Sequence, residues 1–199
     1  MSVVGEDSAG SGVPARRVRA DAQRNVAAVL QAAKAVFAES GVNAPVREVA
    51  ARAGVGVGTL YRHFPQRSDL IAAVFRHEVD ACACATSALA AEHGPAEALE
   101  RWLQRYTGFI ATKRGLAAAL HSGDPAFDAL PAYFQEHLGP ALRSLLDPAV
   151  AAGEIRGDAD PDDLLRAVAN LCLTGRDGTD HARRMVGLLV DGLRYGAPR

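Results

Sequence analysis

The side chains best suited to hydrogen-bond a charged partner gather in one short run of this 199-residue chain. The run consists of Thr59, Tyr61, Arg62 and His63. Hydroxyl, guanidinium and imidazole groups bind phosphate oxygens and the edges of bases. Only Leu60 and Phe64 are left to bury this segment. The run is therefore poorly suited to a core and well suited to contact DNA.

Two short helices joined by a glycine turn are expected to position this run. The first covers residues 45–53, and Gly54 is expected to end it, because glycine tolerates the left-handed backbone of a helix C-terminus. Its apolar positions, which repeat at helical spacing, are Val46, Val49, Ala50 and Ala53. The second covers residues 57–63 and ends at Phe64-Pro65. Such a pair is a helix-turn-helix, whose second helix enters the major groove of DNA.

Positive charge is concentrated around this motif. The whole chain has a formal net charge of −1. Residues 15–67 hold nine Lys and Arg against three Asp and Glu, a net charge of +6. Residues 68–199 hold thirteen against eighteen, a net charge of −5. A basic region beside a helix-turn-helix favours a polyphosphate partner.

The N-terminal residues predict a tail. Residues 1–14 are rich in Gly and Ser and lack the apolar core and basic lead of a signal peptide. We expect residues 1–20 to form a disordered tail with a basic arm. The arginines of this region are Arg16, Arg17, Arg19 and Arg24. They either reach phosphates or a minor groove beside the second helix, or remain solvated.

The motif closely resembles the TetR family of bacterial transcriptional regulators. The matching residues lie at 46–50, 53–55 and 58–65, within a resemblance that covers roughly residues 24–75. Three later stretches, at 114–118, 152–156 and 160–165, resemble one branch of TetR ligand domains. The resemblance implies a DNA-binding domain over residues 21–75 and a ligand-binding and dimerisation domain over residues 76–199. It also implies a homodimeric repressor, released from a pseudo-palindromic operator by a small effector, and not an enzyme.

Nine residues are expected to form the DNA-binding surface. They are Arg47, Gly56, Val57, Gly58, Thr59, Tyr61, Arg62, His63 and Arg67. We expect Thr59, Tyr61 and Arg67 mainly to hold phosphates. Arg47 and Arg62 are expected to read bases, since arginine binds guanine through two hydrogen bonds. Gly56 stands where many family members have a Ser or Thr that caps the second helix, and glycine is itself a fair cap.

The rest of the sequence predicts an all-α fold of about nine helices. Besides the two helices of the motif, the expected helices cover residues 25–40, 68–91, 95–112, 114–121, 127–152, 161–174 and 181–195, with a loop at 175–180. The segment 127–152 is expected to be interrupted or bent near Pro131, Pro140 and Pro148. The last two helices are too broadly apolar for one packed face, as Val186, Leu188 and Leu189 show. A second copy of the chain would cover the remainder.

Two aromatic groups are the candidates for an effector site. Trp102, Tyr106 and Phe109 repeat along one helix face, and Tyr133, Phe134 and His137 form the second group. In the family, helices at these positions surround an effector cavity. The alternative is that these side chains simply form core. Few charged groups separate them in the sequence, so the expected effector is largely apolar.

No other motif predicts chemistry. Cys82 and Cys84 diverge on one helix, the histidines lack metal-ligand spacing, and no nucleotide loop or catalytic triad is present. No cofactor or metal is therefore expected, and the absence of a long apolar run indicates a cytoplasmic protein without a membrane helix. Two alternatives stay open: a regulator with no effector, and a helical small-molecule-binding or enzymatic domain that does not bind DNA.

Overall fold

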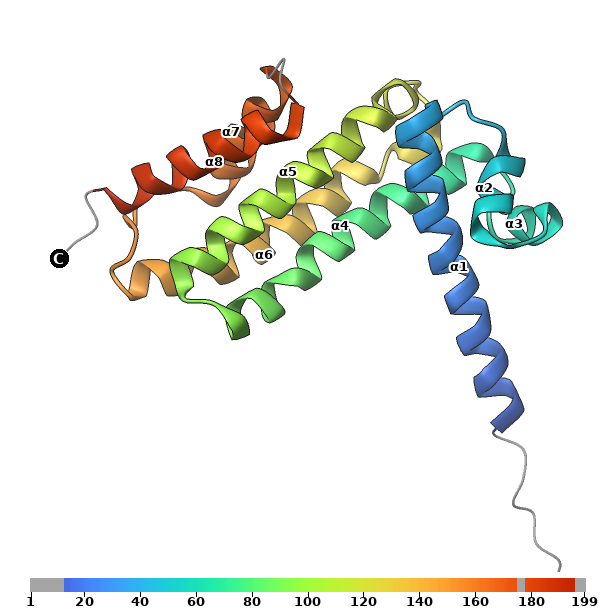
Figure 1. Cartoon of the computed structure of the whole chain (residues 1–199), viewed down its shortest axis with the longest axis horizontal. Coiled ribbons are helices and arrows are strands. Elements are labelled where there is room, and N and C mark those ends of the chain that lie inside the picture. Colours follow the sequence, from blue (N-terminus) through green and yellow to red (C-terminus); the bar gives the residue numbers. More distant parts are fainter. Residues whose placement is uncertain (1–12, 175–177, 196–199) are drawn as a thin grey trace, which may run out of the picture.

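The structure, a computed structural model, describes residues 13–174 and 178–195, with side chains over 23–172 and 180–195. These ranges hold eight α-helices, one short 3₁₀ helix and no strand, so the expected all-α fold is confirmed. In chain order the elements are α1 (Val13–Ser40), α2 (Val46–Ala53), α3 (Val57–His63), α4 (Arg67–Glu92), α5 (Pro95–Leu120), η1 (Pro125–Phe127), α6 (Leu130–Ala151), α7 (Pro161–Thr174) and α8 (Gly178–Arg194). Figure 1 shows α2 and α3 at one end of the molecule and α7 and α8 at the other.

The two helices of the motif form as the sequence predicts. Helix α3 has the predicted bounds, and α2 begins one residue late because Pro45 takes the capping position in front of it. Gly54 ends α2 with a φ of 69° and donates its backbone N–H to the carbonyls of Ala50 and Ala51. A positive φ strains any residue with a β-carbon, so glycine fixes the angle at which α3 leaves α2.

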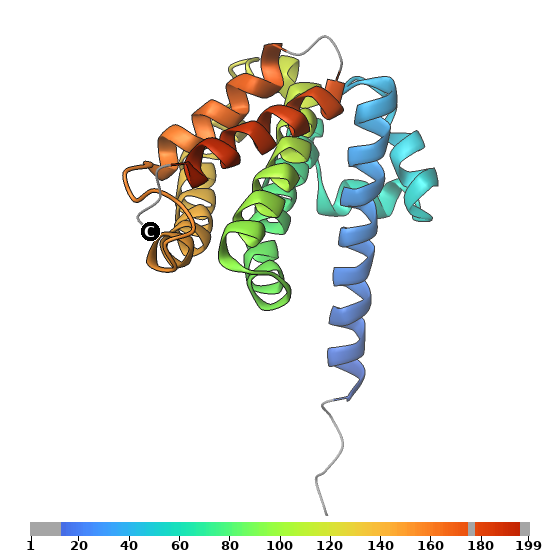
Figure 2. The same ribbon diagram turned by 60° about the vertical axis from the view of Figure 1, so that its left-hand side comes forward.

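Helix α1 is longer than predicted. It begins at Val13 rather than near Asn25, so residues 13–20, expected to belong to a disordered tail, are helical. The physical reason is that residues 15–40 contain neither glycine nor proline, while Pro14 occupies a first-turn position where its missing N–H costs nothing. The basic arm predicted at residues 16–19 thus lies on a helix that extends away from the other elements (Figure 2). Residues 1–12 lie outside the described part of the chain.

Helix α4 connects the motif to the rest of the fold. It packs against α1 near the motif and against α5 and α6 over its length, and these three helices run side by side in Figure 1. Its buried side chains include Leu70, Val74, Phe75 and Val79. The same continuous core extends from Val29 on α1 to Leu193 on α8.

Helix α5 joins two predicted helices into one. The sequence predicted a break near Thr112, yet the helix continues from Pro95 to Leu120. Lys113 and Arg114 are good helix formers, and Gly115 weakens a helix interior without ending it. The helix ends at Leu120 with His121 as its cap, and Gly123 follows in the turn with a φ of 79°. Helix α6 likewise runs unbroken from Leu130, with Pro140 and Pro148 inside it, so the described ranges contain eight α-helices rather than nine.

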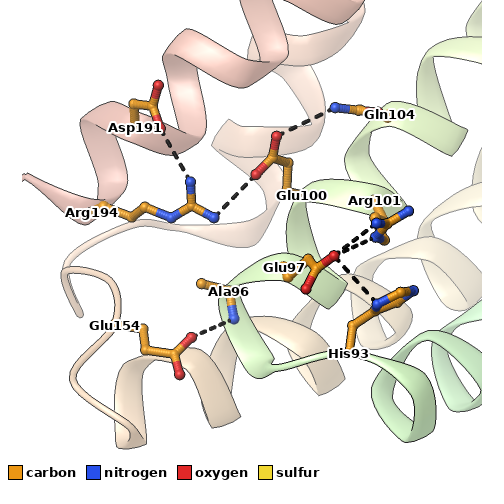
Figure 3. Close-up of polar contacts among 9 residues, drawn as sticks. All are labelled: His93, Ala96, Glu97, Glu100, Arg101, Gln104, Glu154, Asp191 and Arg194. Carbon is orange, nitrogen blue, oxygen red and sulfur yellow. Dashed lines mark hydrogen bonds and ion pairs between the residues drawn. The ribbon is translucent and has the colours of Figure 1, made fainter.

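Polar contacts hold α8 against α5 at the end of the molecule away from α3 (Figure 3). Arg194 on α8 lies 3.1 Å from Glu100 on α5 and 3.1 Å from Asp191 on its own helix. Glu154, which follows α6, accepts a 2.8 Å hydrogen bond from the backbone N–H of Ala96 at the start of α5. The Arg194–Glu100 pair thus holds the last helix against α5, and the Glu154 bond holds the segment after α6 against the start of α5.

The glycine turn gives a matched pair of stability predictions. Gly54→Ala should lower the free energy of unfolding by about 1–2 kcal/mol, because alanine would have to adopt a left-handed backbone. Gly58→Ala should raise it by up to about 1 kcal/mol, because alanine favours helix and an added β-carbon meets no atom within 4 Å. Urea unfolding of both variants measures the difference. Equal effects of the two substitutions would contradict the role given to Gly54.

Candidate nucleic-acid interface and ligand pocket

Helix α3 buries two apolar residues at its C-terminal half and leaves the rest of its surface open. Leu60 is 1% exposed, and Phe64, which follows the helix, is also buried. Val57 and Tyr61 are 40% and 48% exposed, unusually accessible for large apolar side chains. They lie four residues apart and thus share one face of the helix. Gly58 lies next to this face, and it has no side chain that would block the approach of a partner.

The polar residues of the predicted DNA-binding surface are available for contact. Arg47 on α2 and Tyr61 and Arg62 on α3 are exposed. Among the described residues, none of these three side chains forms a hydrogen bond or an ion pair. Thr59 is half-buried at the start of α3, and Gly56 precedes the helix with an extended backbone and no side-chain cap. Contact of these residues with DNA stays a prediction.

His63 is exposed like Tyr61 and Arg62, and it also lies beside a neighbouring helix. It borders a hollow of about 300 Å³ together with His77 on α4 and with Val26 and Leu30 on α1. Its ring centroid lies 6.3 Å from that of Phe64. The structure thus places His63 next to helix α1, at the margin of the predicted surface.

Arg67 has a structural task that the sequence did not reveal. Its Nη1 atom donates hydrogen bonds to the carbonyl oxygens of Val42, at 2.6 Å, and Ala44, at 2.8 Å. Both carbonyls belong to the turn between α1 and α2, whereas Arg67 is the first residue of α4. The side chain therefore pins the start of the motif to the start of α4. A phosphate contact by Arg67 remains a prediction. It would have to use N–H groups other than those of Nη1, which donate to the two carbonyls.

Two further contacts join α1 to α4. Lys34 lies 2.5 Å from Glu78, whose side chain is almost fully buried. Gln31 and His77 form a 2.8 Å hydrogen bond one turn earlier. A buried carboxylate needs a partner to offset its lost hydration, so the Lys34–Glu78 pair holds the two helices in one register.

The first predicted aromatic group is mostly core. Trp102, Tyr106 and Phe109 are all buried, and the Nε1–H of Trp102 donates a 2.9 Å hydrogen bond to the carbonyl oxygen of Cys82 on α4. The Trp102 and Tyr106 rings stack at 5.8 Å between centroids, as do the Tyr106 and Phe109 rings. Burial raises the pKa of Tyr106 well above its ordinary value, so its hydroxyl stays neutral.

The second group divides between a surface pair and the first group. Tyr133 and His137 stack with ring centroids 3.9 Å apart, and the Tyr133 hydroxyl donates a 2.6 Å hydrogen bond to Asp80. Burial and this bond to a carboxylate raise the pKa of Tyr133 to about 12. Phe134 instead meets Tyr106 and Phe109, with centroids 6.3 and 5.8 Å away.

A hollow of about 210 Å³ opens where Tyr106 and Phe134 meet α7. Its lining is Tyr106, Ile110 and Lys113 from α5, Phe134 and Gln135 from α6, and Asp162, Leu165, Arg166 and Ala169 from α7. Two of the six predicted ligand-binding residues thus line it. The expectation that few charged groups lie nearby is wrong, because folding brings Lys113, Asp162 and Arg166 to its wall. The helical spacing of Tyr106, Ile110 and Lys113 was a signal that could have identified Lys113.

The remaining chemistry-bearing residues form no further site. Cys82 is buried and Cys84 exposed, as their spacing predicts, and burial raises the pKa of Cys82 to about 12. Over residues 13–174 and 178–195, no cluster of three metal-ligating side chains occurs. In the same ranges, no helix combines the length and the hydropathy that a membrane span needs.

Comparison with known families matches both parts of the chain. Residues 29–74 match the family described as bacterial regulatory proteins, tetR family. Residues 94–195 match the family described as transcriptional regulator SbtR-like, C-terminal domain. The first match contains α2, α3 and the start of α4, and the second contains α5 to α8.

Solved structures and a curated relative agree with these matches. A TetR transcriptional regulator from Streptomyces coelicolor is 38% identical, with a TM-score of 0.73 over 86% of this chain and 99% of its own. A TetR transcription regulatory protein from Mycobacterium vanbaalenii is 35% identical, with a TM-score of 0.70 over 89% and 99%. An HTH-type transcriptional repressor from Mycobacterium tuberculosis is 35% identical over 111 residues, 55% of this chain. That match spans only about half, 54%, of the repressor's own length.

The two arginines on either side of Phe64 should behave differently when shortened. Arg67→Ala removes both hydrogen bonds to the turn before α2, so it should lower the free energy of unfolding by about 1–3 kcal/mol. Arg62→Ala removes an exposed side chain and should change stability by less than about 0.5 kcal/mol. Thermal unfolding of the two variants checks this. A stable Arg67→Ala protein would show that the turn does not need its clamp.

Proposed function

Because the chain belongs to the TetR family of bacterial regulatory proteins, we propose that it is a transcriptional repressor released from its operator by a small molecule. It is a TetR-family transcriptional regulator by the two family matches and by the relatives above. Repression and release by an effector are the proposal. One curated relative is itself named a transcriptional repressor.

The accessible face of α3 is the observation that carries the proposal. Val57, Tyr61 and Arg62 are exposed on a helix whose buried Leu60 attaches it to the core. Removing the apolar surface of Val57 from water against a partner would be favourable. Val57 fits against the methyl group of a thymine, and Arg62 can pair with guanine. The bare Gly58 lets the helix approach the bases closely.

The proposed repressor is a homodimer that uses α8 as part of its interface. Within one chain, Val186, Val190 and Leu193 are buried, while Leu188 is 63% exposed. The core of one chain thus covers one face of α8 and leaves the apolar side chain of Leu188 exposed on another face. A second copy placed by a two-fold axis would cover it and present two α3 helices to successive major grooves.

Helix α4 is the proposed link between effector and DNA. Only residues 64–66 separate the end of α3 from the start of α4. Arg67 fastens the first turn of α4 to the turn before α2, so a shift of α4 must move the helix-turn-helix. An effector that favours a different position of α4 would lower operator affinity by its differential affinity for the two states.

Aromatic contacts lead from the hollow to α4. Phe134 and Tyr106 line the hollow, Tyr106 stacks on Phe109, and Phe109 meets Phe75 of α4 edge-on with centroids 5.5 Å apart. Close-packed rings cannot be displaced singly, so a ligand that moves Tyr106 or Phe134 disturbs the Phe109–Phe75 contact.

Two other functions remain as competitors. A regulator without an effector would use the same α3 surface, and the 210 Å³ hollow would then be a packing imperfection. A helical enzyme would need catalytic groups; the named relatives are transcriptional regulators, and we propose no enzymatic activity for this chain.

The first prediction of this proposal concerns DNA binding and assembly together. The wild-type protein should bind the DNA that flanks its own gene, as a dimer on a pseudo-palindromic duplex. Leu188→Asp should break the dimer, because it places a charge in the apolar interface, and should abolish tight DNA binding. Light scattering and gel shift measure the two effects. Ala90→Asp, at an exposed position on α4, is the control and should change neither.

Two results would contradict the dimer model. A Leu188→Asp monomer that still binds the duplex tightly would show that one α3 suffices. A Leu188→Asp protein that remains dimeric would place the interface elsewhere. If the wild-type protein binds no DNA from the flanking region, the proposal that it regulates transcription there is contradicted.

The second prediction concerns transmission through the rings. Phe109→Leu should leave operator binding intact but should reduce the loss of affinity that an effector causes. The effector is any compound that stabilises the protein in thermal-shift screening and weakens the gel shift. Phe127→Leu, which also removes a buried ring but lies in η1 outside the chain of contacts, is the matched control. Equal effector responses of the two variants would reject the proposed route.

A further inference from the structure

The hollow between α5, α6 and α7 has an apolar wall and a cationic mouth. The rings of Tyr106 and Phe134, together with Ile110 and Leu165, supply the wall. Lys113 stands at the edge with its Nζ 5.5 Å from the centroid of the Phe134 ring. An ammonium held over a ring face is attracted by the π-electrons and keeps a defined position.

Resting on the proposed function above, we propose that the effector is a small aromatic acid whose carboxylate is bound by Lys113. Lys113 forms no ion pair with any described residue, so its charge is open to a ligand. A carboxylate and an ammonium form a charge-assisted hydrogen bond, which is roughly twice as strong as a neutral one. The ring of the ligand would then pack against Ile110 and Leu165.

The other charges of the hollow do not cancel this site. Arg166 adds a second positive charge, already engaged with the exposed Asp163 at 3.2 Å. Asp162 is the only acid in the lining, and its Oδ1 lies 3.9 Å from where a β-carbon on Gly139 would be. Gly139 follows Phe134 by five residues, a distance of about 7.5 Å along α6. The carboxylate of Asp162 thus lies beside Gly139, whereas Lys113 lies over Phe134.

The size of the hollow limits the ligand. About 210 Å³ is below the usual range for sites that hold drug-sized molecules. One aromatic ring with a short acid chain, or a compact two-ring acid, suits this volume. A long acyl chain or a nucleotide does not.

Direct binding tests the inference without DNA. Isothermal titration of the full chain would use benzoate, phenylacetate, 3-phenylpropionate and 2-naphthoate, with the amide of each acid and with benzylamine. At least one acid should bind about tenfold more tightly than its own amide, because the amide carries no charge for Lys113 to pair with. The same acid should weaken the gel shift.

Three variants locate the carboxylate. Lys113→Met should remove the preference for acid over amide, and Lys113→Arg should retain most of it. Arg105→Met is the matched control, because Arg105 is an exposed cation on the same helix that lies outside this hollow. It should leave the preference unchanged. Circular dichroism confirms that each variant is folded.

The outcomes separate this inference from the proposed function. Equal binding of acids and amides, preferential binding of benzylamine, or equal losses in Lys113→Met and Arg105→Met would overturn it. Failure of every acid to bind would overturn it as well. If a neutral compound then releases the protein from its operator, the proposed repressor function is retained and the proposal of an acidic effector is rejected. Acid binding at Lys113 without any effect on DNA would retain the site and reject its regulatory role.

Discussion

Helix α4 packs in the core behind the helix-turn-helix and in the core of the C-terminal helices, and this sharing constrains every other element. Its first residue is fastened to the turn before α2, and Glu78, in its middle, pairs with Lys34 of α1. Phe75 meets Phe109, and the carbonyl of Cys82 accepts a hydrogen bond from Trp102. Residues 67–92 contain neither glycine nor proline, so the helix has no built-in hinge. A displacement of one end of α4 should therefore also displace its other end.

Helix α3 depends on this support because it cannot be stable alone. Isolated helices shorter than about 12–15 residues are marginal in water, and α3 has seven. Leu60 and Phe64 attach it to the core, and Gly54 fixes its direction. Since so few residues are used for packing, most of its remaining surface is accessible to a partner. Because only residues 64–66 separate α3 from α4, a small movement of α4 also moves α3.

The sequence was sufficient wherever structure is decided locally. Gly54, the bounds of α3 and the opposite exposure of Cys82 and Cys84 follow from neighbouring residues alone. Helix ends without a strong breaker were misjudged, as in α5, where Gly115 only weakens the helix. The Arg67 clamp could not be foreseen, because its acceptors are backbone carbonyls more than twenty residues away, which any sequence would offer. Asp162 and Arg166 join the wall of the hollow only when α7 packs against α5 and α6.

The size of the hollow bears on how a small ligand could switch a regulator. Moving a two-state equilibrium from 1:99 to 99:1 requires about 5.5 kcal/mol of differential binding. If two ligands act on one dimer, each must supply about half of this, roughly 2.8 kcal/mol. A charge-assisted hydrogen bond contributes roughly 1.5–3 kcal/mol when it forms in one state only. Lys113 lies on α5 and rests over Phe134 of α6, so its position depends on the spacing of those helices. A contact sensitive to that spacing can discriminate between two positions of α4, whereas an apolar contact that forms equally in both shifts nothing.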